Sequence, residues 1–297
     1  MSDEKLYRYS EIFHSIQGEG TYTGVPTAWL RFFNCNLQCD GFGQKDPKDS
    51  STYVLPYKDF DVSKIETFEE LPVWETGCDS SYSWSKKYRH LAPQGTVDEI
   101  ASAVIAEITN RYNPHGKFGK MHMCFTGGEP LLKHAQECSS LVLKEWIERR
   151  NIPWKITYET NGTQALTDEF AKTYYEYVNV WGGEIFFSCS PKLESVSGEK
   201  ASKAIDPYVV AQYNDIFRTG QLKFVINGTK DSWDEMEGVI TKFKAHGIEW
   251  PVWVMPVGAT VEGQELVAGD VAKEAYLRGY NVCARVHTYL WGNKIGV

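Results

Sequence analysis

Three cysteines in the N-terminal third of the chain are the strongest candidates for metal chemistry. Cys35 and Cys39 are separated by three residues in a polar loop, and Cys78 follows much later. Two thiolates at this spacing can turn toward one metal centre. Zinc sites normally use two such pairs, and this sequence has no second pair. Three thiolates instead suggest an iron–sulfur cluster in which one iron stays open for a further ligand.

The other four cysteines fit a structural role better. Cys124, Cys138, Cys189 and Cys283 fall inside predicted strands or a predicted helix, where a thiol packs as a small apolar side chain. Seven cysteines is an odd number, and the charged N-terminal sequence lacks the apolar core of a signal peptide. We therefore expect a cytoplasmic protein without a disulfide framework.

Helical and strand patterns alternate from residue 96 onward. Strands are expected at residues 28–33, 121–125, 155–159, 185–189, 222–226, 252–255 and 281–286. Helices are expected at 97–108, 133–150, 167–177, from Asp206-Pro207, from a capping box at Ser232–Glu235, and at 264–278 before Gly279. This alternation predicts parallel strands joined by right-handed crossovers. The architecture is either an open doubly wound sheet or a full or partial barrel.

Polar, glycine and proline residues follow most of these strands. They occur at residues 34–39, 126–130, 160–162, 190–192 and 256–258, and His287 follows the last strand. Turns alone account for any one of these loops. Parallel α/β folds place their active sites at the carboxyl ends of the strands, so the whole set predicts a site at one edge of the sheet.

Composition limits the remaining possibilities. The 297 residues are 42% hydrophobic and 24% charged, which is typical of a globular protein. There are 31 basic and 39 acidic residues, giving a net charge of −8 that argues against a broad nucleic-acid or membrane-surface binder. No apolar run approaches the roughly 20 residues of a membrane-spanning helix. Residues 40–77 are polar without clear periodicity, and we interpret them as an insertion that forms a small lobe.

The cysteines and one glycine-rich loop resemble those of the radical S-adenosylmethionine (SAM) enzymes. That family carries Cys-x3-Cys-x2-Cys, followed after the next strand by Gly-Gly-Glu, as at Gly127–Glu129 here. Cys78-Asp79-Ser80, followed by Tyr82 and Trp84, is similar to the end of the cluster loop in 7-carboxy-7-deazaguanine synthases. Because 38 residues separate Cys39 from Cys78 instead of two, an insertion of 36 residues would split this loop.

Further matches to these synthases occur in the same order along the chain. They are Ser15–Gly20, Trp29–Phe32, Phe125–Pro130, Glu159–Gly162, Ser190–Lys192, Arg285–His287, Trp291-Gly292 and Gly296-Val297. The resemblance reaches both ends of the sequence. It implies a single domain over residues 1–297, folded as a partial TIM-like barrel of the radical SAM type, with residues 40–77 inserted in the cluster loop.

The resemblance also implies a set of site residues. Cys35, Cys39 and Cys78 would hold a [4Fe–4S] cluster, and Ser80 would bind Mg²⁺. The residues that would bind SAM are Gly77, Cys78, Asp79, Gly128, Ser190, Pro191, Lys192, Met255, Pro256, Val257 and Gly258. The residues that would bind the substrate are Ile16, Gln17, Gly18, Arg31, Thr126 and Val297. No acid or base catalyst is assigned among them, and His287 and Glu129 remain open between structural and functional roles.

The implied reaction converts 6-carboxy-5,6,7,8-tetrahydropterin to 7-carboxy-7-deazaguanine with loss of ammonia. Such an enzyme is a carbon–nitrogen lyase of deazapurine (queuosine-type) biosynthesis that takes electrons from a flavodoxin or ferredoxin, and a homodimer is expected by analogy. Neither nucleic acid nor membrane is expected as a partner. Two alternatives stay open: a radical SAM activase that makes a glycyl radical on a protein partner, and a non-catalytic metal or nucleic-acid binding module.

Overall fold

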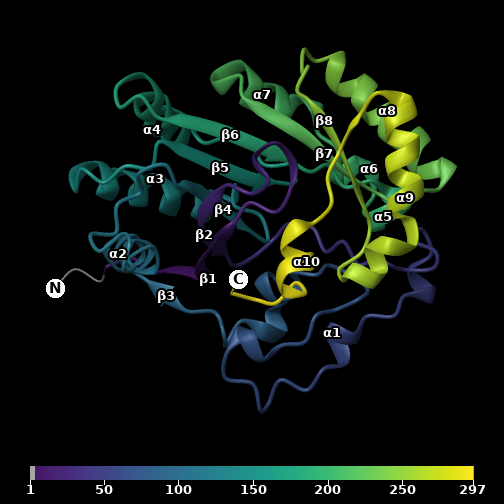
Figure 1. Ribbon diagram of the computed structural model, residues 1–297, viewed down its shortest axis with the longest axis horizontal. Helices are drawn as coiled ribbons and strands as arrows, with labels where there is room; N and C mark the ends of the chain where they lie inside the picture. Colours follow the sequence, from purple (N-terminus) through teal and green to yellow (C-terminus); the bar gives the residue numbers. More distant parts are fainter. Residues whose placement is uncertain (1–3, 297) are drawn as a thin grey trace.

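Residues 4–296 are described by a computed structural model, which is built around one open sheet (Figure 1). Within these residues the sheet has nine strands in the order β3-β1-β2-β4-β5-β6-β7-β8-β9. The strands are β1 (Tyr7–Ile16), β2 (Pro26–Phe32), β3 (Gln94–Gly95), β4 (His122–Gly127), β5 (Lys155–Thr160), β6 (Glu184–Cys189), β7 (Gly220–Ile226), β8 (Val252–Pro256) and β9 (Asn281–Val282). The seven strands β2-β4-β5-β6-β7-β8-β9 pair in parallel, whereas β1 pairs antiparallel with both β2 and β3.

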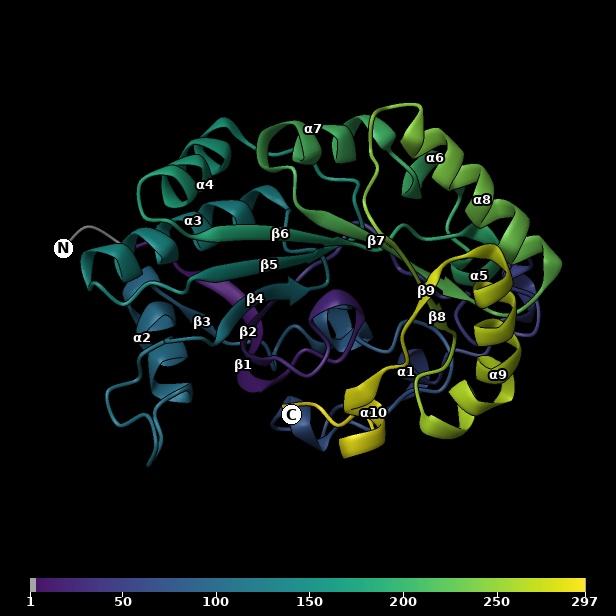
Figure 2. The same ribbon diagram turned by 45° about the horizontal axis from the view of Figure 1, so that its top comes forward.

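The helices follow the strands as the alternating pattern predicts. The longer ones are α2 (Val97–Glu107), α3 (Lys133–Glu148), α4 (Asp168–Asn179), α7 (Pro207–Phe217), α8 (Lys230–Lys244) and α9 (Val261–Arg278). The short ones are α1 (Pro56–Asp59), α5 (Glu194–Ser197), α6 (Ala201–Ala204) and α10 (Val286–Trp291). Figure 2 shows the curved sheet with the longer helices on its outer side. The sheet does not close, because β3 and β9 are its two edges, and the predicted partial barrel is confirmed.

Successive side chains of the parallel strands alternate between an apolar outer face and a polar inner face. The outer row packs under the helices and includes Leu30, Phe125, Tyr158, Phe187, Phe224 and Val254. The inner row includes Arg31, Thr126, Glu159, Ser188 and Lys223. The outer row supplies the main hydrophobic core, and the inner row leaves polar groups for a site inside the barrel.

Helix caps explain several of the boundaries. Thr96 and Glu99 form the predicted capping box at the start of α2. Asp206 caps α7 with Pro207 at its first position, and Gly279 ends α9 in the left-handed conformation, both as predicted. The capping box expected at Ser232 is wrong. Helix α8 begins two residues earlier, where the Thr229 hydroxyl accepts a hydrogen bond from the Ser232 amide.

Two strand predictions need correction. The sequence pattern missed β1, in which a register shift between Tyr9 and Glu11 breaks the two-residue alternation. The strand expected over residues 281–286 is wrong, because only Asn281 and Val282 pair with β8 and a helix begins at Val286. Beyond Val282 the chain turns toward the loop after β1, where the Val286 amide donates a hydrogen bond to the Gly18 carbonyl at 3.0 Å.

Residues 40–77 contain only short helical turns, and their buried side chains join a largely aromatic cluster that is separate from the main core. The cluster comprises Phe33, Tyr57, Phe68, Leu71, Trp74, Tyr82, Tyr88 and Ala92. The Tyr88 hydroxyl donates to the Tyr57 carbonyl at 2.6 Å, which ties the two halves of this cluster together. The lobe's packing therefore continues past residue 77, to Ala92.

Aromatic side chains cover the inside of the partial barrel at the amino ends of its strands. Tyr22 lies edge-on against both His122 and Phe186, and Trp154 lies edge-on against His122. The ammonium group of Lys155 lies over the rings of Tyr22 and Trp154. We call these five residues the barrel floor. Within residues 4–296, no helix combines the length and apolar character needed to span a bilayer.

The barrel floor gives the protein a specific pH dependence. Burial, helped by the nearby Lys155 charge, lowers the pKa of His122 from 6.5 to about 4. The unfolded chain binds a proton at this histidine below pH 6.5 and the folded chain does not, so stability falls as pH drops from 6.5 toward 4. At pH 4.5 this loss amounts to about 3 kcal/mol of unfolding free energy relative to neutral pH. His122→Phe should abolish this part of the pH dependence. Urea titrations at pH 7 and 4.5 measure it. The exposed His115→Asn should lose as much stability as the parent, and an equal loss in His122→Phe would contradict the prediction.

Candidate active site

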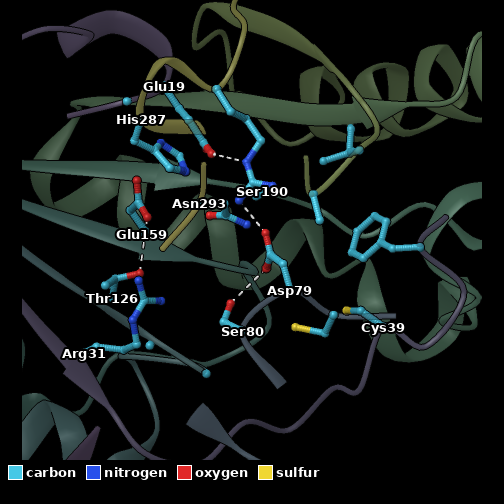
Figure 3. A pocket seen from close by; sticks show the side chains of 18 of the residues that line it. Glu19, Arg31, Cys39, Asp79, Ser80, Thr126, Glu159, Ser190, His287 and Asn293 are labelled. Atoms are coloured by element: carbon cyan, nitrogen blue, oxygen red, sulfur yellow. Dashed lines mark hydrogen bonds and ion pairs between the residues drawn. The ribbon is translucent and has the colours of Figure 1, made fainter. Parts of the chain in front are cut away.

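A cavity of about 280 Å³ lies at the carboxyl ends of the parallel strands (Figure 3). Its walls come from the strand ends, the loop after β1, the end of the 40–77 segment and the C-terminal tail. The predicted site residues that line it are Ile16, Gln17, Gly18, Arg31, Cys35, Cys39, Gly77, Cys78, Asp79, Ser80, Thr126, Gly128, Ser190, Lys192, Met255, Pro256, Val257 and Gly258. Pro191 is buried away from it, and Val297 lies outside the described residues. The structure thus brings together residues spread over most of the chain.

The loop that carries Cys35 and Cys39 is held by a buried carboxylate. Glu199 accepts hydrogen bonds from the amides of Gln38 and Cys39 at 2.6 and 2.9 Å. Cys39 adopts a positive φ of 55°, a conformation that the two bonds help to maintain. Both thiols therefore lie on a fixed loop directly after β2, at the cavity wall.

Cys78 reaches the same wall because the 40–77 segment is pinched at its base. The Gly77 amide donates to the Phe42 carbonyl at 2.8 Å. Gly43 passes so close to the other arm that a Cβ there would lie 2.7 Å from the Glu75 carbonyl oxygen. The intervening residues loop out as the lobe, and the chain returns beside its starting point. Cys39 and Cys78 are thus far apart in sequence but line the same cavity.

The three thiols lie within electrostatic reach of one another. Burial raises the pKa of Cys39 well above its usual value, and the Cys78 and Cys35 thiols raise it further against the opposing effect of Lys192. Within residues 4–296, no three metal-binding side chains converge on a single ion. In a cubane cluster each thiolate binds its own iron, so the sulfurs need not converge on one point. Three free thiols at one wall therefore fit a [4Fe–4S] cluster better than a single zinc ion.

The glycine pair after β4 allows two loops to touch. A Cβ on Gly127 would lie 2.3 Å from the Phe32 carbonyl oxygen, and one on Gly128 would lie 2.2 Å from the Asn34 carbonyl oxygen. The Glu129 amide donates to the same Asn34 carbonyl at 2.9 Å. The missing side chains thus let the β4 loop pack directly on the backbone that leads into Cys35.

Glu129 is a structural bridge. It is fully buried, and its carboxylate accepts hydrogen bonds from the Leu131 amide, the Thr160 hydroxyl and the Asn161 amide at 2.7–2.9 Å. Burial raises its pKa to about 7 against these bonds. The role left open by the sequence is therefore that of a tie between the loops after β4 and β5.

A buried chain of charges crosses the cavity and includes residues that the sequence analysis did not assign. Asp79 accepts from the Ser80 hydroxyl at 3.0 Å and forms an ion pair with Arg285. Arg285 also bonds Glu19 at 3.2 Å, and Glu19 pairs with Lys223. Burial alone would raise the pKa of Glu19, but Lys223 and Arg285 outweigh it and lower that pKa. A lysine in the middle of an apolar strand was the one sequence signal for Lys223.

Arg31 projects into the cavity from β2 and is held by Glu11. Its Nε donates to Glu11 Oε1 at 2.5 Å, and the Tyr82 hydroxyl donates to the same oxygen at 2.8 Å. Burial would lower the pKa of Arg31, but Tyr82 and Glu11 raise it, so the guanidinium stays charged. The other Glu11 oxygen accepts from the Gly296 amide at 3.0 Å, which brings the C-terminal tail to this wall.

Glu159 is a further cavity carboxylate. One of its oxygens accepts from Gln17 Nε2 and the other from the Thr126 hydroxyl, both at 3.2 Å. On the opposite side Lys192 donates to the Ser190 hydroxyl at 3.0 Å. Positive and negative groups thus face one cavity from different strands. Such a cavity suits a flat ligand with several donors and acceptors and at least one carboxylate.

Comparisons with known proteins found chains that are similar in sequence and one that is similar in fold. No protein-family model matches the chain. A 7-carboxy-7-deazaguanine synthase of Halobacterium salinarum is 25% identical over 96% of this chain and 90% of its own length. One from Pyrobaculum aerophilum is 24% identical over 100% of both chains, and one from Methanopyrus kandleri is 31% identical over 54% of this chain and 52% of its own. The chain is therefore similar to the first two synthases over nearly its whole length, and to the third over about half of it.

The fold also occurs among solved structures. QueE from Escherichia coli aligns over 95% of each chain with a TM-score of 0.51 and 14% sequence identity. At that identity the likeness concerns the architecture: a mixed α/β sheet that is curved but not closed. The long segment between Cys39 and Cys78 therefore sits within a fold that another chain builds in the same overall way.

Proposed function

We propose that this chain is a 7-carboxy-7-deazaguanine synthase of the radical SAM family. The observation that carries the proposal is the return of Cys78 to the wall that holds Cys35 and Cys39, inside a cavity lined by nearly all predicted ligand residues. The similarity to synthases of this name over nearly the full length supports it. A glycyl-radical activase has no comparable support.

The chain's own residues would divide the work of binding. Cys35, Cys39 and Cys78 would hold the [4Fe–4S] cluster, which together with SAM supplies one-electron hydrogen-abstraction chemistry. The residues proposed to bind SAM are Gly77, Cys78, Asp79, Gly128, Ser190, Lys192 and Met255–Gly258. Pro191, which is buried and does not line the cavity, would shape the loop that presents Ser190 and Lys192. Ser80 would give Mg²⁺ one oxygen, and substrate oxygens and waters would complete its octahedron.

The substrate would lie between opposite charges. Arg31 would bind the carboxylate of 6-carboxy-5,6,7,8-tetrahydropterin through its rigid donor fork. Gln17, Thr126 and the backbone of Ile16 and Gly18 would contact the polar ring edge. Glu159 would accept hydrogen bonds from N–H groups of the pterin ring. Val297 is also proposed as a substrate-binding residue. The buried walls would exclude water from the reacting carbon.

The proposed reaction releases ammonia and gives 7-carboxy-7-deazaguanine, as a carbon–nitrogen lyase step of queuosine-type biosynthesis. A flavodoxin or ferredoxin would supply electrons, and the enzyme would work as a cytoplasmic homodimer. Neither nucleic acid nor membrane is part of the proposal.

One experiment tests this function. The protein is prepared anaerobically, reconstituted with iron and sulfide, reduced, and incubated with SAM and the pterin. Formation of a product with the mass of 7-carboxy-7-deazaguanine is the expected result. Cleavage of SAM without conversion of the pterin would favour an activase, and a preparation that binds zinc but no iron and sulfide would contradict radical chemistry.

A further inference from the structure

The loop between β1 and β2 folds back into the barrel. The Gln17 amide donates to the Val25 carbonyl, and the Gly24 amide donates to the Gln17 carbonyl, both at 2.8 Å. We call residues 17–25 the barrel loop. Figure 2 shows it in purple on the inner side of the sheet, opposite the helices. Its first residues line the cavity, so whatever fixes this loop also fixes one wall of the site.

Contacts descend along the barrel loop from the cavity to the floor. At the cavity, Glu19 pairs with Lys223. One step lower, Thr21 donates to Gln221 Oε1 from both its amide and its hydroxyl, at 2.9 and 2.8 Å. The glycine before Thr21 has φ +70° and faces the same Gln221, which a Cβ would approach to 2.3 Å. The loop thus has a fixed course with a partner at each level.

Tyr22 ends this series in the barrel floor. Its hydroxyl accepts a hydrogen bond from Lys155 Nζ at 2.5 Å, and its ring centroid lies 4.9 Å from those of His122 and Phe186. Lys155 is itself buried and pairs with Glu184 at 2.6 Å. Tyr22 does not line the cavity. Its contacts therefore act on the site only through the barrel loop.

We propose that Tyr22 is a positioning residue whose anchor in the barrel floor holds Gln17, Gly18 and Glu19 in place for the substrate. Without this anchor the barrel loop would keep only its upper contacts, and the freedom that it gained near the floor would have to be lost each time the substrate bound, which weakens binding. With the anchor in place the loop is ordered beforehand. The anchor itself is independent of the reaction, but its effect on the pterin rests on the proposed function.

The test compares Tyr22→Ala with Tyr22→Phe, which keeps the ring and loses only the hydroxyl. In the protein without substrate, hydrogen exchange at the Gln17 and Gly24 amides should be faster in Tyr22→Ala than in the parent. With the reconstituted enzyme, the KM for the pterin should rise about tenfold in Tyr22→Ala, while SAM cleavage without pterin stays unchanged. Tyr22→Phe should fall between the two. The exposed Tyr208→Ala on α7 should match the parent in every assay.

The outcomes separate positioning from general stability. A role in stability alone would lower the melting temperature and kcat of Tyr22→Ala without raising KM, and that result would overturn the proposal. Lys155→Met removes the donor to the Tyr22 hydroxyl and should, like Tyr22→Phe, show exchange at the two amides that is faster than in the parent, so the proposal remains testable if Tyr22→Ala does not fold. If the parent itself converts no pterin, the proposed function fails, while the exchange rates still report on the anchor.

Discussion

Replacing Cys78 with alanine is expected to give a folded protein that no longer assembles the cluster. The thiol is one of three at the cavity wall, and the loop base that presents it is held by the backbone bond between Gly77 and Phe42 rather than by the thiol itself. Changes to the partners of metal ligands already reduce affinity or activity by about 10–100-fold, so loss of a ligand should reduce SAM cleavage by more than about 100-fold. Iron content and visible absorbance after anaerobic reconstitution measure the effect.

Cys138→Ala is the matched control. Cys138 lies fully buried in α3 within the main core, far from the cavity wall, and the change removes one thiol from the chain in the same way. It should cost about 1 kcal/mol of unfolding free energy and leave iron content unchanged. Iron retained in Cys78→Ala at the level of Cys138→Ala would show that the third ligand lies elsewhere.

The sequence predicted most of the helices and parallel strands because each carries its own local signal. Helix α2 has both a capping box and an apolar face, and α9 ends at a glycine that takes the left-handed conformation. Alternation of such elements leaves few topologies, because parallel crossovers are right-handed. The pattern could not decide between an open sheet and a barrel, since closure depends on the cumulative twist of many strands and not on any one of them.

The elements that were missed or wrong depend on distant partners. In β1, buried polar residues interrupt the alternation: the neighbours Ser10 and Glu11 are both buried at the register shift. After Val282 the chain leaves the sheet, where Arg285 is drawn to Asp79 and Glu19 from other parts of the chain. Local periodicity contains no information about such pairs. The structure of the lobe of residues 40–77 could not be predicted for the same reason, because its aromatic side chains pack on one another and not on a regular element.

The same distinction applies to the cavity. Motif residues were found because their types and positions match a family, and 18 of them line one cavity. Their partners were not found. Glu11 holds Arg31, and Lys223 balances Glu19, yet neither belongs to a motif. A buried charge needs a counter-charge, so each charged motif residue implied a partner. Its location became visible only once the strands were placed side by side.

Arg31→Met is expected to reduce kcat/KM for the pterin by about 10–100-fold. Only Nε of the guanidinium is engaged by Glu11, and its terminal nitrogens make no hydrogen bond within residues 4–296. They face the cavity and can donate to a carboxylate in parallel. Hydrogen bonds to charged groups contribute about 1.5–3 kcal/mol, which corresponds to this range. Arg31→Lys should recover only part of the loss, because an ammonium group lacks the planar fork.

A second variant separates substrate binding from the stability of the wall. Arg31→Met alone leaves the buried Glu11 carboxylate without its cation, which destabilises the fold independently of any ligand. In the double variant Arg31→Met/Glu11→Gln the amide oxygen can still accept from Tyr82, whereas the bond from the Gly296 amide is lost, so the urea midpoint should recover part of the way toward that of the parent. The kcat/KM for the pterin, measured by steady-state kinetics with saturating SAM, should not recover. If the double variant regained the parent's kcat/KM, Arg31 would act through Glu11 and the fold, and the carboxylate of the substrate would have to be bound by another cation at the cavity, such as Lys192 or Arg285.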